Sequence, residues 1–325
     1  MLISVVLPAY NEEGNLPLLF KRLAAVAAQF KDHNFEFVFV DDCSSDATHA
    51  ILAQLKAEDS RIQIIRFTRN FGSHAAVEAG LKYCRGDAAV IMATDLQDPP
   101  ELIPRLIEQW QKGFKTVWGV REKREGESLS TIICSRIYYF LMNHLSDVQQ
   151  PPTGADVVLI DRAVIEALKI APEKNSEIFM LIAWLGFSQT HVMYIKEARH
   201  AGYSKWNFTK LLKLFFDSLI SFSYIPLRLM SFIGSLLALI GLLYGIFVII
   251  KRFQGIIDIE GYASLLIVML LIGGFQMCMM GVLGEYLWRT YDETRKRPKY
   301  VIENNTLVED GLTKMVQMSD VINTR

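Results

Sequence analysis

Two long stretches without a charged residue, residues 229–250 and 261–284, lie in the last third of this 325-residue chain. A helix rises ~1.5 Å per residue, so about 20 apolar residues cross the ~30 Å hydrocarbon core of a bilayer. Each stretch is therefore long enough for one crossing. Roughly 200 residues with the charge content of a soluble domain precede them. The sequence predicts a folded N-terminal domain anchored by a hairpin of two membrane-spanning helices.

Basic residues near the two stretches predict which side of the membrane the domain occupies. Arg228 precedes the first stretch, and a basic cluster follows the second: Arg289, Arg295, Lys296, Arg297 and Lys299. The connecting loop carries two basic residues, which Asp258 and Glu260 offset. Basic residues that flank membrane spans stay in the cytoplasm. We therefore expect the domain and both termini in the cytoplasm, and a flexible polar tail after Pro298.

Short β-rich runs alternate with helical patterns in the part before the membrane stretches. The strand candidates are residues 3–7, 36–40, 62–67, 88–92 and 116–120, and helical patterns such as 16–30 and 47–57 lie between them. This alternation predicts an α/β fold with a mostly parallel sheet covered by helices. Ligands of such sheets bind beyond the carboxyl ends of the strands.

Acidic residues follow three of the predicted strands. They are Glu12 and Glu13 after the first, Asp41 and Asp42 after the second, and Asp95 and Asp98 after the fourth. Carboxylates crowded at one edge repel each other unless a cation or hydrogen-bond donors compensate them. The cluster therefore indicates a metal ion or a polyhydroxylated ligand. Alternatively, Asp41, Asp42 and Asp98 only cap helices.

Several other ligand classes lack their usual sequence motifs. No Gly-x-Gly-x-x-Gly turn follows the first predicted strand, and the sequence has no Walker-type phosphate loop. Dinucleotide and P-loop chemistry are thereby disfavoured. The formal net charge is -1 and the sequence has no basic stripe, so we expect no binding of nucleic acid.

Four ordered motifs resemble those of glycosyltransferase family 2. They are Val-Val-Leu-Pro-Ala-Tyr-Asn-Glu-Glu at 5–13, Val-Asp-Asp at 40–42, Arg-Asn-Phe-Gly at 69–72 and Asp-Leu-Gln-Asp-Pro-Pro at 95–100. The chain is most similar to the polyprenyl-phosphate branch of the family, which includes dolichyl-phosphate mannose synthases and bactoprenol glucosyltransferases. The resemblance extends over nearly the whole chain, including the two C-terminal stretches.

The resemblance implies a GT-A (Rossmann-like) fold and an inverting transfer of a hexose to a polyprenyl phosphate. The expected donor is UDP-glucose and the expected acceptor is undecaprenyl phosphate, at the cytoplasmic face of the bacterial inner membrane. The product would be a lipid-linked monosaccharide. The same chemistry with another sugar, such as mannose or aminoarabinose, is an alternative.

The resemblance also implies roles for residues at the strand ends. Pro8, Tyr10, Glu12 and Asp42 match positions that hold the base and ribose, and Asp95 and Gln97 match the metal and diphosphate positions, with Mg²⁺ or Mn²⁺ as the ion. Mannose synthases carry Asp-Ala-Asp-Leu-Gln here, whereas Ala93 replaces the first acid in this chain. We therefore expect Asp95 to act in catalysis as the principal metal ligand, with Gln97 as a neutral helper.

Asp156 is the second expected catalytic residue, because it matches the aspartate usually assigned as the base. Val158 replaces the arginine that relatives often carry two positions later. A phosphate monoester has a second pKa of about 6 and is largely ionised at neutral pH. Asp156 therefore either positions the acceptor or takes its last proton, and the alternative is a helix-capping aspartate.

A basic segment at 199–206 precedes a sharply amphipathic stretch at 206–225. In the family a similar Arg-x-x-Gly-x-Ser-Lys segment grips the diphosphate and the acceptor phosphate, which assigns Arg199 and Lys205 to this role. Arg121 is a further diphosphate candidate. The alternative is a juxtamembrane patch that binds anionic lipid. The amphipathic stretch predicts a helix in the headgroup region, or one packed against another subunit.

We therefore expect four parts: a glycosyltransferase domain at 1–205, an interfacial helical segment at 206–225, a two-helix transmembrane hairpin at 226–290 and a cytoplasmic tail at 291–325. The Gly241-x-x-x-Gly245 spacing also predicts a homo-oligomer. The competing hypothesis is a non-catalytic membrane scaffold or sensor on a degenerate nucleotide-sugar fold, motivated by Ala93 and Val158.

Overall fold

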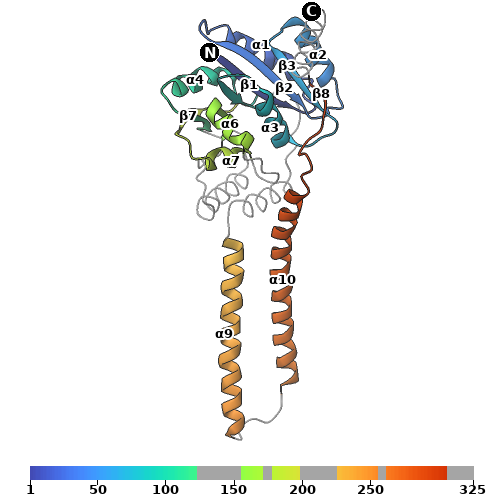
Figure 1. Ribbon diagram of the computed structural model, residues 1–325, viewed down its shortest axis with the longest axis vertical. Coiled ribbons are helices and arrows are strands. Elements are labelled where there is room, and N and C mark those ends of the chain that lie inside the picture. Colours follow the sequence, from blue (N-terminus) through green and yellow to red (C-terminus); the bar gives the residue numbers. More distant parts are fainter. Residues whose placement is uncertain (123–154, 171–177, 198–224, 255–260, 306–325) are drawn as a thin grey trace, which may run out of the picture. The chain divides into compact units, whose positions relative to one another are not determined.

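A computed structural model describes residues 1–122, 155–170, 178–197, 225–254 and 261–305 (Figure 1). The chain divides into two compact units. One unit comprises Met1–Phe215 together with Pro298–Arg325, and the other comprises Phe216–Arg297.

The first unit is built on an eight-stranded sheet with the order β7-β5-β6-β4-β1-β2-β3-β8. The strands are β1 (Leu2–Ala9), β2 (Asn34–Asp41), β3 (Ile62–Phe67), β4 (Ala88–Ile91), β5 (Thr116–Arg121), β6 (Ala155–Asp161), β7 (Gln189–Tyr194) and β8 (Ile302–Asn305). Neighbours among β1 to β4 pair in parallel, as do β5 and β7, whereas β6 and β8 run antiparallel to their neighbours. The predicted α/β fold with a mostly parallel sheet is confirmed.

Helices cover both faces of this sheet (Figure 1). They are α1 (Leu16–Ala27), α2 (Thr48–Glu58), α3 (Ser73–Tyr83), the short helix η1 (Pro100–Leu102), α4 (Ile103–Gln111), α6 (Arg162–Ile170) and α7 (Ile178–Trp184). Ile3, Val5 and Leu7 of β1 share one buried core with α1 and α4. The intervening Val6 faces α3, where a Cβ added to Gly80 would lie 2.3 Å from Val6 Cγ1. Glycine at position 80 thus permits the close approach of α3 to the sheet.

The polar tail differs from its predicted flexibility. Residues 302–305 form β8, which pairs antiparallel with the edge strand β3. The Tyr300 ring stacks on Phe67 with 5.0 Å between ring centroids, and Lys299 Nζ lies 2.5 Å from Glu78 Oε2. The prediction is wrong for residues 299–305 because a tertiary partner fixes a segment whose own composition is polar. Covering β3 in this way also protects a sheet edge that would otherwise offer unpaired backbone groups.

The second unit contains two long helices, α9 (Ile225–Phe253) and α10 (Tyr262–Thr294). Gly234 of α9 would place an added Cβ 3.7 Å from the Met279 side chain of α10, so the helices pack side by side. Among the described residues one helical window, Leu227–Tyr244, is long and apolar enough to cross a membrane, with mean hydropathy 1.9. The second predicted span falls within α10, and a two-helix membrane hairpin stays a prediction.

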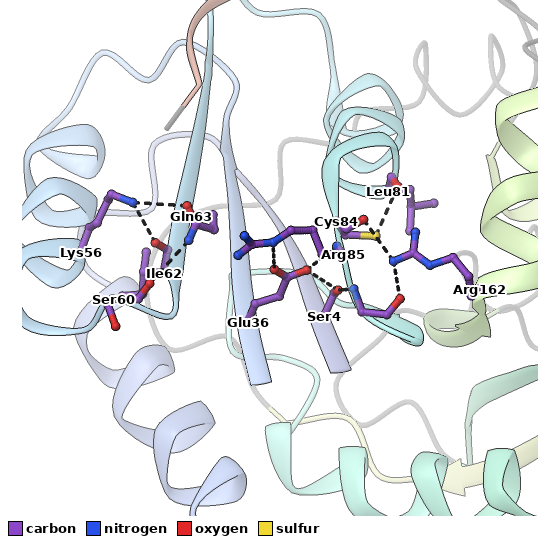
Figure 2. Close-up of polar contacts among 11 residues, drawn as sticks. Ser4, Glu36, Lys56, Ser60, Ile62, Gln63, Leu81, Cys84, Arg85 and Arg162 are labelled. Carbon is purple, nitrogen blue, oxygen red and sulfur yellow. Dashed lines mark hydrogen bonds and ion pairs between the residues drawn. The ribbon is translucent and has the colours of Figure 1, made fainter. Parts of the chain in front are cut away.

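A buried polar network joins the first unit at the amino ends of the strands (Figure 2). Glu36 of β2 is 2% exposed, and its Oε1 accepts from Ser4 Oγ and from the Arg85 backbone N–H, each at 2.6 Å. Ser4 Oγ in turn accepts from the Gly86 N–H at 2.8 Å. Arg162 of α6 donates to the carbonyl oxygens of Cys84 and Gly86. These bonds tie β1, β2, α6 and the turn before β4 together.

Glu36→Ala should lower the free energy of unfolding of the first unit by about 2 kcal/mol, because Ser4 and Arg85 lose a charged, buried acceptor. The measurement is thermal unfolding in detergent. The matched control is Glu108→Ala, which removes an exposed carboxylate of α4 that pairs with Lys112 at the end of the helix. Equal unfolding temperatures for the two variants would contradict the importance of the network.

Candidate active site

Charged side chains gather at the rim where the parallel strands have their carboxyl ends. Because β6 runs antiparallel to β4 and β5, its amino end lies at this same rim. Asp156, the second residue of β6, is therefore brought to the end of β5, where Arg121 is the last residue. The topology thus explains how an aspartate at the start of one strand meets groups at the ends of others.

The loops after β1 and β2 are joined by reciprocal hydrogen bonds. The Asn11 N–H donates to Ser44 Oγ at 3.0 Å, and Asn11 Oδ1 accepts from the Ser45 N–H at 2.9 Å. The Glu12 N–H donates to Thr48 Oγ1 at 2.8 Å. These bonds hold the segment that includes Tyr10 and Glu12, two residues expected to bind the base and ribose. Their roles stay predictions.

Pro8, a third expected nucleotide residue, lies in β1 opposite Val40 of β2. Its carbonyl oxygen accepts a hydrogen bond from Thr94 Oγ1 at 2.9 Å. This contact connects the end of β1 to the loop that follows β4. The predicted nucleotide and metal segments are therefore neighbours in the structure.

Asp42 is 3% exposed and binds the backbone of the loop after β3. Its Oδ1 accepts from the Phe71 N–H at 2.6 Å, and its Oδ2 accepts from the Gly72 N–H at 2.9 Å. Burial raises the pKa of Asp42, although these two N–H donors act in the opposite direction. Gly72 has a φ of 96°, which favours glycine at this turn. Asp42 thus positions the Arg-Asn-Phe-Gly segment, and its predicted contact with ribose is untested.

Asp95 and Gln97 lie together in the loop after β4. The Gln97 N–H donates to Asp95 Oδ1 at 3.2 Å, and Leu96 between them has a φ of 60°. The described residues contain no group of three or more His, Cys, Asp or Glu side chains that could hold a metal ion. A carboxylate and an amide oxygen still fit Mg²⁺ or Mn²⁺, since such ions take one or two protein ligands and complete their shell with phosphate oxygens and water.

Asp98 is a buried carboxyl group of the same loop and is 1% exposed. Tyr194 of β7 donates its hydroxyl hydrogen to Asp98 Oδ1 at 2.5 Å. Within the described part of the chain, Asp98 Oδ2 is buried without a hydrogen-bond partner. Burial, with a further contribution from the charge of Asp156, raises the pKa of Asp98 to about 6.

Asp156 binds two cations through one carboxylate oxygen. Arg121 Nη2 contacts Asp156 Oδ2, and Lys196 Nζ donates to the same oxygen at 2.7 Å. Although burial alone would raise the pKa of Asp156, the charges of Arg121 and Lys196 hold it below its ordinary value. This group is ionised at neutral pH.

Sequence reasoning missed Lys196 and Tyr194. Tyr194 is the last residue of β7 and Lys196 follows two residues later. β7 lies beside β5, with Arg121 opposite Tyr194. The run Gln189–Tyr194 is short and mixed in polarity, so its strand could not be recognised without its partner. Arg199 and Lys205, the predicted diphosphate and acceptor residues, lie outside the described residues, as does the predicted amphipathic helix at 206–225.

Val158, where relatives often have arginine, is fully buried in β6 and pairs with Ile91 and Trp118. An arginine in this environment would bury a charge within the sheet. The departure at this position is therefore explained by packing.

A mostly parallel sheet with charged groups gathered at one rim defines an α/β protein that binds its ligand at the strand ends. Residues 4–168 match the family model described as glycosyl transferase family 2. The chain is 38% identical over 302 residues to an uncharacterized glycosyltransferase of Synechocystis, with 93% of this chain and 95% of that protein covered. It therefore belongs to glycosyl transferase family 2, and the predicted enzyme with a GT-A-like fold is confirmed.

Two further relatives carry more specific names. The prophage bactoprenol glucosyl transferase homolog of Escherichia coli is 38% identical over 303 residues, covering 93% of this chain and 99% of that protein. The prophage-derived bactoprenol glucosyl transferase of Shigella flexneri is 38% identical over 305 residues, covering 94% and 98%. The predicted resemblance to this branch is confirmed.

The raised pKa of Asp98 gives a prediction for stability against pH. Its value of about 6 exceeds the ~3.9 of an unperturbed aspartate, so the native state binds the proton more tightly than the unfolded state does. Asp98 therefore lowers the free energy of unfolding as pH rises from about 4 to above 6, by up to about 3 kcal/mol.

Asp98→Asn keeps an acceptor oxygen for Tyr194 but cannot ionise, so this part of the pH dependence should disappear. The measurement is the unfolding temperature between pH 4.5 and pH 8 in the presence of a chelator, for the wild type and the variant. Asp32→Asn, at an exposed position before β2, is the control. Parallel curves for wild type and Asp98→Asn would contradict the prediction.

Proposed function

We propose that this glycosyltransferase transfers a hexose from a nucleotide diphosphate sugar to a polyprenyl phosphate and produces a lipid-linked monosaccharide. The observation that carries the proposal is the 38% identity over 93–94% of the chain to proteins named bactoprenol glucosyl transferase or its homolog. UDP-glucose and undecaprenyl phosphate are the proposed substrates. The rim of acids and cations supports binding of two phosphorylated ligands.

The donor binds at the ends of β1 and β2 in this proposal. Pro8, Tyr10, Glu12 and Asp42 surround the base and ribose, and the hydrogen bonds between the two loops keep these residues in place before the donor arrives. Such preorganisation reduces the entropy lost on binding. Asp42 contributes by holding the Phe71 and Gly72 backbone rather than by a charge exposed to solvent.

Asp95 and Gln97 hold the divalent cation in this proposal, and Mg²⁺ and Mn²⁺ both suit their oxygen atoms. A cation bound there supplies positive charge to the departing diphosphate. Asp95 acts in catalysis through this charge. The single acid, with Ala93 in place of a second one, predicts weak metal binding without nucleotide.

The reaction is a displacement at the anomeric carbon. An oxygen of the acceptor phosphate forms a bond to C1 of the hexose, and the bond from C1 to the diphosphate oxygen breaks on the opposite face. The diphosphate leaves with the electron pair as UDP, and the configuration at C1 inverts. The acceptor is largely ionised at neutral pH, so little proton transfer is needed. Arg121, next to Asp156, attracts the phosphates of the substrates.

The membrane anchor in this proposal is the hairpin of α9 and α10, with the active site at the cytoplasmic face of the bacterial inner membrane. The window Leu227–Tyr244 supports one span, since it is apolar and none of it is buried within the protein. Basic residues after the second stretch support the orientation. Arg199, Lys205 and the amphipathic segment 206–225 are proposed to meet the lipid phosphate at the surface, and the protein to form a homo-oligomer.

Purified protein in nanodiscs with undecaprenyl phosphate, Mn²⁺ and labelled nucleotide sugars should transfer label to the lipid from one donor. Asp95→Ala should reduce the rate at least 100-fold, because the leaving diphosphate loses its bound cation, while Asp32→Asn should keep the wild-type rate. Extraction of labelled lipid into organic solvent is the measurement. Absence of transfer from every donor, with UDP binding intact, would contradict the proposed acceptor.

The membrane topology predicts the behaviour of reporter fusions. Green fluorescent protein fused after residue 325 should fluoresce, because it stays in the cytoplasm. Alkaline phosphatase inserted into the loop at 255–260 should be active, because that loop lies on the other side of the membrane. Inactive phosphatase with stable full-length expression would rule out the hairpin.

A further inference from the structure

We propose that Lys196 binds the phosphate of the acceptor together with Arg121, and that Asp156 anchors these two cations instead of taking a proton. This inference rests on the proposed transfer to a lipid phosphate. It assigns a binding role to a residue that lies outside the motifs of the sequence. We call this group of Lys196, Arg121 and Asp156 the two-cation clamp.

Within the clamp, positive charge exceeds negative charge. Arg121 and Lys196 contact the same oxygen, Asp156 Oδ2, so one negative charge faces two positive charges. Asp98 also acts on both cations from the neighbouring loop. Two cations at one oxygen suit the binding of an anionic phosphate group. A carboxylate that accepts two charge-assisted hydrogen bonds at one oxygen is stabilised in its ionised form and is a poor proton acceptor.

Lys196 and Arg121 each have a hydrogen-bond donor without a partner among the described residues. A lysine ammonium has three donors, and within the described part of the chain Asp156 is the partner that Lys196 contacts. Arg121 Nε is buried and has no hydrogen-bond partner among the residues that the structure describes. The side chains of Arg121 and Lys196 are 11% and 21% exposed, so a ligand would meet them in a partly desolvated place. A phosphate oxygen would satisfy donors that the protein itself leaves open.

The segment around Lys196 is held by contacts on both sides. Tyr194, two residues earlier, donates to Asp98. The Glu197 N–H donates to the Gln97 carbonyl oxygen at 2.8 Å, beside the predicted metal loop. Glu197 also accepts two bonds of 2.9 Å from Arg22 of α1, which binds Glu101 as well. Lys196 is thus fixed next to the loop that carries Asp95.

The position fits the geometry that transfer requires. The donor diphosphate is proposed to lie at Asp95 and Gln97, and the acceptor phosphate must approach from the other face of the sugar. The two-cation clamp lies across the same rim, on β5, β6 and the segment after β7, while the nucleotide loops follow β1 and β2. Asp95 and Gln97 would therefore hold the donor diphosphate and Lys196 the acceptor phosphate, while Arg121 would attract both.

The test compares Lys196→Met, Lys196→Arg and a matched control, Lys56→Met. Lys56 of α2 is also partly buried, but its ammonium donates to the Ile62 carbonyl oxygen and to Gln63 Oε1 (Figure 2). Binding of a short, soluble prenyl monophosphate and of UDP is measured by calorimetry, and steady-state transfer gives KM for the lipid. Lys196→Met should weaken prenyl phosphate binding and raise KM by about 10-fold or more, since a hydrogen bond between charged groups is lost.

UDP binding should stay within twofold in all three variants, Lys196→Arg should recover most of the lipid affinity, and Lys56→Met should resemble the wild type. Unchanged prenyl phosphate binding in Lys196→Met, with only a lower unfolding temperature, would reduce Lys196 to a structural ion pair. If the wild type binds UDP but neither binds nor glycosylates prenyl phosphate, the proposed acceptor and this inference both fail. If the wild type transfers normally and Lys196→Met binds as tightly, only this inference fails.

The pH dependence of kcat separates an anchor from a base. The charged and titratable groups that act on Asp156 include Arg121 from β5, Tyr194 at the end of β7, Lys196 two residues later, and Asp98 from the loop after β4. If Asp156 only anchors, the acidic limb of the profile persists in Asp156→Asn, because it then reflects ionisation of the acceptor phosphate. If Asp156 takes the proton, the acidic limb disappears in Asp156→Asn together with most of the rate, and such a loss would overturn the anchor role.

Discussion

The negative charge of each carboxylate at this rim of the sheet must be balanced by a cation, a hydrogen-bond donor or a proton. The rest of the active site is arranged to meet that requirement. Asp42 is compensated by two backbone N–H groups. Asp98 receives a hydrogen bond from the Tyr194 hydroxyl, while burial raises its pKa and favours its protonated form. Asp156 is compensated by two side-chain cations. Because each acid uses a different means, the rim holds carboxyl groups whose pKa values are shifted in opposite directions. In the proposed function, this division would let one edge bind a sugar nucleotide and a second phosphate.

At the opposite ends of the strands, a buried carboxylate is again compensated by hydrogen-bond donors, and there the hydrogen bonds stabilise the fold. Glu36 is as deeply buried as Asp42, and its acceptors are likewise filled, by Ser4 and by Arg85. That network connects neighbouring strands. A rigid, satisfied network at one end of the sheet supports loops at the other end. In those loops Arg121 Nε and Asp98 Oδ2 stay without hydrogen-bond partners among the described residues.

The parts of the fold that sequence could predict are those set by local pattern. Apolar runs at 3–7, 36–40, 62–67 and 88–92 appear as β1 to β4, and the acids that follow them lie at the expected rim. Asp95, Gln97 and Asp156 were found through the resemblance to the family. Lys196 was not, since its importance depends on the pairing of β5 with β7 and on the reversed direction of β6. β8 was missed for a similar reason: Ile-Glu-Asn-Asn becomes a strand only when β3 is beside it.

The pairing of β8 with β3 also constrains the order in which the protein can be completed. Residues 302–305 leave the ribosome after α9 and α10, although the strand that they join lies within the first 70 residues. Throughout synthesis of both long helices, β3 is therefore the outermost strand of the sheet on that side. The last pairing of the sheet, and the stacking of Tyr300 on Phe67, form only when the chain beyond α10 is made. The sheet can therefore be complete only after the whole preceding chain has been synthesised.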